Sequence, residues 1–178
     1  MRPPAPSYAG EGPLALWHVS EDSAISRFEP RRGSDGLSLI WAVDTRQLPL
    51  YWFPRDCPRG TFRADSDTTP PDRQAFLGNA TRIHAIQQDW VEQFDRAELV
   101  AYRMPEEAFA PHPEVGGYWV SDAPVEPVGT HNLRDLRSLH AEAEIPLRIV
   151  PDLSALWQRV IRSSLEFSGM RLRNLGNA

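Results

Sequence analysis

The feature that most restricts the fold of this chain is the segment Phe53-Pro54-Arg55-Asp56-Cys57-Pro58-Arg59, in which two prolines flank the only cysteine. Each proline fixes its own φ angle and pushes the residue before it towards extended geometry, so the segment predicts a stiff turn. The turn follows an apolar stretch that we expect to be buried. Because a rigid turn holds two guanidinium groups and one thiol in defined directions, it is a candidate site.

Length and charge limit the classes of protein to which the chain can belong. The 178 residues fit a single globular domain, which we expect over residues 14–174 after a proline-rich, flexible leader at residues 1–13. The net charge of -5 and the lack of a dense basic run argue against general nucleic-acid binding. All 19 basic residues are arginine, which excludes Schiff-base and P-loop mechanisms that need lysine.

The cysteine and histidine content predicts no metal site. One cysteine cannot form an internal disulfide, and the five histidines show no metal-ligand spacing. The N-terminus lacks the apolar core of a signal peptide, and no apolar run approaches the length of a membrane span. We therefore expect a cytoplasmic protein without a membrane partner.

Short apolar runs predict many short strands mixed with short helices. We expect strands over residues 14–19, 37–43, 60–64, 82–86, 98–104, 117–121, 125–128 and 146–150. Helices are expected over residues 45–53, 87–94, 133–143 and 153–165, with Asn132 and Asp152 capping the last two and Gly169 stopping the last. Since these elements follow no βαβ rhythm, they predict an α+β fold.

Five stretches, spread over nearly all of residues 14–174, resemble an uncharacterised bacterial family of unknown function. They are Trp17-His18-Val19-Ser20, Phe28-Glu29-Pro30-Arg31, the Phe53–Arg59 turn, Gly117-Tyr118-Trp119-Val120-Ser121 and residues 167–173. More distantly, a strand ending in His18, an Ile-Trp-Ala-Val strand followed by a helix, and two late strands resemble the ADP-ribosyltransferase fold, which RNA 2'-phosphotransferases share. This resemblance implies a mixed sheet with short flanking helices.

The same resemblance implies NAD as a cofactor, with cleavage or transfer at the nicotinamide ribose. In the His-Tyr-Glu branch of ADP-ribosyltransferases, it assigns His18 to the ribose and either Tyr51 or Tyr118 to stacking on nicotinamide. Where that branch carries a glutamate at the start of the late strand, this chain has glycine, and Glu114 is the acid nearby.

Arginines support a pocket for a phosphorylated or anionic small molecule. Arg31, Arg55 and Arg59 offer planar forks that match phosphate or carboxylate oxygens, although arginines also form purely structural ion pairs. For His18, the alternative is a core histidine whose ring nitrogens bind backbone groups. A non-catalytic module that carries an anionic metabolite would use the same pocket.

Cys57 suggests a third function, a cysteine-dependent hydrolase or transferase. Flanking arginines favour its thiolate, and His18, Asp56 or His84 are candidate partners, whereas a lone cysteine is also typical of a small buried hydrophobe. Trp41 is more typical of a core residue than of a cofactor contact. The candidate catalytic residues are thus His18, Cys57, Glu114 and Tyr118, and the candidate cofactor-binding residues are His18, Ser20, Arg31, Trp41, Tyr51, Arg55 and Arg59.

Overall fold

The computed structural model describes residues 15–33 and 36–175, so the leader expected at residues 1–13 lies outside the described part. The chain forms two compact units. Unit 1 comprises residues 1–52 and 98–134, and unit 2 comprises residues 53–97 and 135–178. Each unit therefore combines two segments that are far apart in the sequence.

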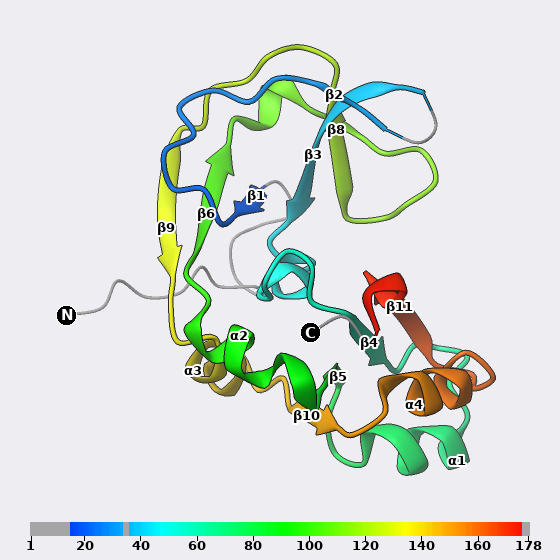
Figure 1. Ribbon diagram of the computed structural model, residues 1–178. Coiled ribbons are helices and arrows are strands. Elements are labelled where there is room, and N and C mark those ends of the chain that lie inside the picture. Colours follow the sequence, from blue (N-terminus) through cyan, green and yellow to red (C-terminus); the bar gives the residue numbers. More distant parts are fainter. Residues whose placement is uncertain (1–14, 34–35, 176–178) are drawn as a thin grey trace. The chain divides into compact units, whose positions relative to one another are not determined.

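Unit 1 is built on one antiparallel sheet, which has seven strands in the described part of the chain (Figure 1). Its order is β7-β8-β3-β1-β6-β9, and β2 adds a short pairing to β3. The strands are β1 (Leu16–Ser20), β2 (Arg31–Arg32), β3 (Ser38–Asp44), β6 (Leu99–Met104), β7 (Ala110–Pro111), β8 (Tyr118–Ser121) and β9 (Gly129–Leu133). Two 3-10 helices, Leu48–Tyr51 and Glu106–Ala108, accompany the sheet.

Alternation along the strands separates the two faces of this sheet. One face is the core of unit 1, where Leu16, Ile40 and Tyr102 pack with apolar residues from neighbouring loops. The other face carries the residues between them, including Trp17 and Trp41, and it is this face that holds the site described below.

Unit 2 has a four-stranded sheet in the order β10-β5-β4-β11, in which β5 and β10 are parallel and the other pairs are antiparallel (Figure 1). The strands are β4 (Arg59–Arg63), β5 (Arg82–Gln87), β10 (Leu147–Val150) and β11 (Glu166–Met170). The helices are α1 (Pro70–Asp72), α2 (Val91–Arg96), α3 (Leu136–Glu142) and α4 (Leu153–Val160). Short irregular turns of helix occupy Arg73–Leu77, Gln88–Trp90 and Leu172–Asn174.

Helix α4 packs against the sheet of unit 2 through Trp157, and two glycines make this approach possible. A Cβ atom on Gly169 would lie 2.6 Å from the Trp157 ring, and one on Gly60 would lie 3.0 Å from it. Leu153 and Val160 of the same helix are buried in the core of this unit. Asp152 caps the helix by accepting a hydrogen bond from the backbone N–H of Ala155, as predicted.

The predicted α+β class is confirmed, but several element boundaries were wrong. Residues 125–128 form no strand, because Val125 makes an isolated bridge to Phe28 and a proline follows it. The expected helix at residues 133–143 begins later and is capped by Asp135 instead of Asn132. The expected helix at residues 153–165 ends at Val160, and the helix expected at 45–53 shortens to one 3-10 turn. Strands β9 and β11 had not been predicted.

Candidate functional site

The candidate site lies where the ladder between β1 and β3 is interrupted. Within the described residues, these strands pair at Leu16 with Asp44 and at Trp17 with Val43, and there the pairing stops. The same register would place Val19 opposite Trp41. Further along β3, Leu39 pairs with Arg31 of β2 instead.

The backbone directions show that β1 and β2 lie along the same edge of β3. The N–H of Asp44 donates to Gly117 on the β8 side, so the amide groups of Val43, Trp41 and Leu39 point to the opposite side. Trp41 is consequently the one β3 residue on this edge between the last β1 pair and the first β2 pair. Its N–H and C=O point into the interruption, as do those of Val19 from β1.

His18 fills part of this interruption. Its Nδ1 lies 2.7 Å from the carbonyl oxygen of Trp41, and because a carbonyl only accepts, Nδ1 carries the hydrogen and donates it. Its ring packs on Phe28, with 4.7 Å between the ring centroids. The alternative of a core histidine that binds a backbone group therefore holds for Nδ1.

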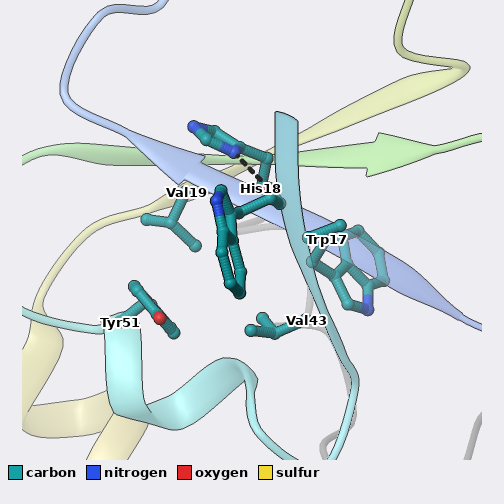
Figure 2. Close-up of a pocket in the computed structure, with 7 residues that line it drawn as sticks. Trp17, His18, Val19, Val43 and Tyr51 are labelled. Atoms are coloured by element: carbon teal, nitrogen blue, oxygen red, sulfur yellow. Dashed lines mark hydrogen bonds between the residues drawn. The ribbon is translucent and has the colours of Figure 1, made fainter. Parts of the chain in front are cut away.

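A cavity of about 60 Å³ opens beside the interruption. It is lined by Trp17, His18, Val19, Trp41, Ala42, Val43 and Tyr51, and Figure 2 shows the Tyr51 and Val43 side chains facing it. An apolar cavity of about 150 Å³ holds a benzene molecule, so this one admits only the edge of a flat ring. A larger ligand would extend out of it over the sheet.

Aromatic side chains continue from the cavity across the same face. The Tyr51 hydroxyl donates to the Tyr118 hydroxyl at 3.3 Å, and the Tyr118 ring meets the Trp41 ring edge-on at 6.3 Å. His112 stacks on Trp41, with centroids 4.9 Å apart and planes inclined by 27°. With 38% of its surface exposed, Trp41 offers a ligand an aromatic surface.

His112 had been assigned no role from the sequence. Its Nδ1 accepts hydrogen bonds from the backbone N–H groups of Glu114 and Val115, both at 3.2 Å, so its hydrogen is on Nε2. Nothing in the local sequence signals this arrangement, because the stack on Trp41 depends on the hairpin between β7 and β8.

The predicted turn at Phe53–Arg59 belongs to unit 2, and its cysteine is not a thiolate. Cys57 is fully buried, and this burial, opposed only partly by the charge of Arg59, raises the pKa of its thiol to about 12. Arg59 does favour the thiolate, as the sequence predicts, but the cost of desolvation exceeds this attraction, so the thiol stays neutral.

Arg59 is also buried and takes part in internal contacts. Its Nη1 donates to the carbonyl oxygen of Cys57 at 3.1 Å, its Nη2 lies 3.1 Å from the sulfur of Met170, and its guanidinium stacks on the Phe53 ring. Arg55 is exposed, and its carbonyl oxygen accepts a hydrogen bond from Arg171. The turn is thus a packed structural element.

Comparison with protein families places the whole folded region in one family. A family model described as a family of unknown function, DUF6886, matches residues 17–175. The chain belongs to DUF6886. No curated protein and no solved structure matches this DUF6886 chain.

Unit 1 of this DUF6886 chain brings together only some of the predicted site residues. His18, Trp41 and Tyr51 line the cavity, and Tyr118 touches Tyr51. Arg31 lies opposite Leu39, so it shares the face of Trp41 and is exposed. The hydroxyl of Ser20 instead accepts the N–H of Asp22, and Glu114 is exposed in the loop between β7 and β8.

A second hollow of the DUF6886 chain, of about 610 Å³, lies on unit 2. Asp89, Glu92 and Asp95 contribute carboxylates to its wall. Glu92 pairs with Arg96 and Asp95 pairs with Arg137, so these charges bind one another. Both arginines are thus engaged by carboxylates, and the lining of the hollow has three carboxylates against one arginine, Arg96. This excess of negative charge disfavours the anionic ligand that the sequence predicts, so the hollow is the weaker candidate.

Two further findings concern membranes and metals. Among the residues that the structure describes, no helix has the length and apolar character needed to cross a bilayer. In the same residues, no three histidine, cysteine or carboxylate side chains come together as a metal site.

Proposed function

We propose that this chain binds a phosphorylated ligand with a flat aromatic ring, and that NAD is the first candidate. The observation that carries the proposal is the interruption between β1 and β3, where backbone groups and aromatic side chains border the same small cavity. Ligand pockets commonly combine an apolar wall with a few polar groups that fix orientation.

The interruption favours a ring that carries an amide. Val19 and Trp41 direct backbone groups into it without pairing with each other in the β1–β3 ladder. A carboxamide, with one donor and one acceptor side by side, can bond to such strand edges as a neighbouring strand would. The nicotinamide ring of NAD has this group, and its edge suits the volume of the cavity.

The rest of the ligand would lie over the exposed face of the sheet. Trp41 supplies a stacking surface there, and Arg31 supplies a cation on the same face. An arginine fork binds phosphate oxygens with two parallel hydrogen bonds. The proposed pose therefore runs from the cavity across Trp41 towards β2.

The proposal includes binding but no catalytic step. The residues that line the cavity include no carboxylate that could stabilise a cationic ribose, and Glu114 lies outside this lining. The buried, neutral thiol of Cys57 gives no support to a cysteine-dependent enzyme. Likeness to ADP-ribosyltransferases remains part of the proposal, and it rests on His18, Tyr51 and Tyr118.

Thermal unfolding with NAD, ADP-ribose, ATP, nicotinamide and phosphate tests the proposal. A ligand at 100 times its Kd stabilises the folded state by about 2.7 kcal/mol, which raises the Tm of a chain of this length by about 5 to 10 °C. We expect this shift with NAD and its loss in Trp41→Ala. The matched control is Val128→Ala, which truncates another exposed residue of unit 1 and keeps the shift. The absence of a shift with all five compounds would overturn the proposal.

A further inference from the structure

Unit 2 contains a buried pair of histidines that the proposed ligand site does not use. His84 comes from β5 and His140 from α3, and they are 0% and 2% exposed. The Nδ1 of His84 lies 3.0 Å from the Nε2 of His140, and the Nδ1 of His140 lies 2.7 Å from the carbonyl oxygen of Leu136.

These distances fix the position of every hydrogen in the pair. The carbonyl of Leu136 accepts, so His140 carries its hydrogen on Nδ1 and presents Nε2 as an acceptor. His84 must then donate from Nδ1, which leaves a lone pair on its own Nε2. That nitrogen is buried and has no hydrogen-bond partner among the described residues. This assignment holds for neutral rings, and burial keeps both rings neutral by lowering their pKa values, so both have the Nδ1–H tautomer.

The surroundings of the pair disfavour a positive charge. Arg59 on β4 and Arg82 on β5 are buried, and both lower the pKa of His84 after the larger effects of its burial and of His140. Burial lowers the pKa of His140 to about 4. Cys57, whose carbonyl oxygen accepts a hydrogen bond from Arg59, is a neutral thiol and supplies no negative charge. A proton on His84 Nε2 would thus enter a site without an acceptor, next to two guanidinium groups.

The pair also supports the turn that contains the cysteine. The Phe53 ring contacts both imidazoles, with centroid distances of 5.4 Å to His84 and 5.3 Å to His140. The guanidinium of Arg59 stacks on the Phe53 ring and donates a hydrogen bond to the carbonyl oxygen of Cys57. Phe94 of α2 completes the group through contacts with Phe53 and His140.

We propose that His84 and His140 form an acid-sensitive latch in unit 2. While neutral, they hold α3 and the Phe53–Arg59 turn against β5. A proton on His140 Nε2 removes the acceptor of His84 Nδ1 and breaks the hydrogen-bond chain, whereas a proton on His84 Nε2 leaves the chain in place but adds a buried charge that repels Arg59. In either case the turn opens to expose Cys57. The open form takes up a proton from solvent, and no other reactant is needed.

The sign and size of the effect follow from linkage. A histidine in the open form has a pKa of about 6.5, so the open form binds more protons than the closed form below that pH. Acid therefore favours opening. For one proton taken up, the opening equilibrium constant rises about tenfold for each pH unit between the two pKa values.

Thiol labelling tests the latch on the intact chain, because Cys57 is the only cysteine. The probe is 4,4'-dithiodipyridine, which forms a mixed disulfide with the thiol and releases 4-thiopyridone. Rates from pH 7.5 to pH 5.0 are divided by the rate of the urea-unfolded chain at the same pH. We expect the ratio to rise about tenfold per unit below pH 6. A ratio that does not change with pH would overturn the latch.

A variant and a spectroscopic measurement separate the latch from general acid unfolding. Asparagine at position 84 keeps a donor near the position of Nδ1 but does not titrate, so His84→Asn should weaken the pH dependence. The control His112→Asn changes a histidine of unit 1 and should keep it. An equal pH dependence in His84→Asn and the wild type would count against the latch.

If His84→Asn does not fold, nitrogen NMR of the wild type at pH 7.5 still tests the latch, because it reports the tautomer of each histidine. The latch requires the Nδ1–H tautomer at both His84 and His140. Detection of the Nε2–H tautomer at either residue would refute the hydrogen-bond chain.

Discussion

At the scale of single residues, two adjacent arginines on β2 lie on opposite faces of the sheet. Arg31 lies opposite Leu39 and therefore shares the face of Trp41, while Arg32 lies opposite Ser38 and points to the other face. Both are exposed, so their difference is one of direction and not of burial. This pair is a natural test of where an anionic ligand lies on the sheet.

We expect Arg31→Gln to weaken the binding of ADP-ribose about 5- to 15-fold, because it removes a charged hydrogen bond to phosphate worth about 1 to 1.5 kcal/mol. Binding of nicotinamide, which has no phosphate, should not change. Titration calorimetry measures both, with Arg32→Gln as the matched control. Equal losses in the two arginine variants would mean that the charge acts non-specifically.

At the scale of elements, the sequence predicted the strands better than their boundaries. Short apolar runs located β1, β3, β6 and β8 to within two residues, because side chains of each strand are buried in unit 1. The pattern at β9 was too polar to be recognised, although that strand pairs with β6 from Leu99 to Arg103. Gly169 was interpreted as a helix stop, whereas it lies in β11 under Trp157.

The candidate site was only partly predictable for a similar reason. His18, Trp41 and Tyr51 were singled out from the sequence, and they do meet at one cavity. Their meeting depends on where a ladder stops, however, and the stacking of His112 depends on a hairpin, so no local pattern reveals either. The burial of Cys57 agrees with one of the two interpretations that the sequence allowed, a small buried hydrophobe. The sequence could not decide between them, because the charge of Arg59 and the burial have opposite effects on the pKa of the thiol.

The close approach of α4 to β11 predicts a strong effect of one added methyl group. In Gly169→Ala, the new Cβ would lie 2.6 Å from Trp157 and 2.7 Å from Leu172, so we expect a loss of about 1 to 3 kcal/mol of unfolding free energy. In Gly116→Ala, the new atom has no neighbour within 4 Å, and the change should be below about 0.5 kcal/mol. Urea unfolding compares the two, and similar midpoints would contradict the packing of Trp157.

At the scale of the whole molecule, stability should fall in two stages as the pH is lowered. His84 and His140 have lowered pKa values, so the folded state resists their protonation, and their contribution is complete above about pH 6.5. As the pH falls towards 4, this contribution to the unfolding free energy is lost by about 1.4 kcal/mol per pH unit for each histidine. Hydrogen bonds from Ser164 lower the pKa of Asp72, and its contribution is lost at still lower pH.

Urea midpoints measured between pH 7.5 and pH 2.0 should show this order. His140→Gln should flatten the upper stage and leave the lower one in place. A midpoint that stays constant from pH 7.5 to pH 4.5 would exclude a titrating buried pair. Loss of stability above pH 7 would point to a different group, since both histidines are already neutral there.

The division of each unit between two distant segments has a consequence for synthesis on the ribosome. Among the described strands β1 is made first, yet its five residues pair with residues of β6 that follow 80 to 88 positions later. At about 5 to 20 residues per second, the nascent β1 waits several seconds or more for its neighbour. During that delay its apolar residues need protection by a chaperone or by transient contacts. If the expressed chain aggregates, we therefore expect expression at low temperature, or with an excess of a ribosome-associated chaperone, to increase the yield of folded protein.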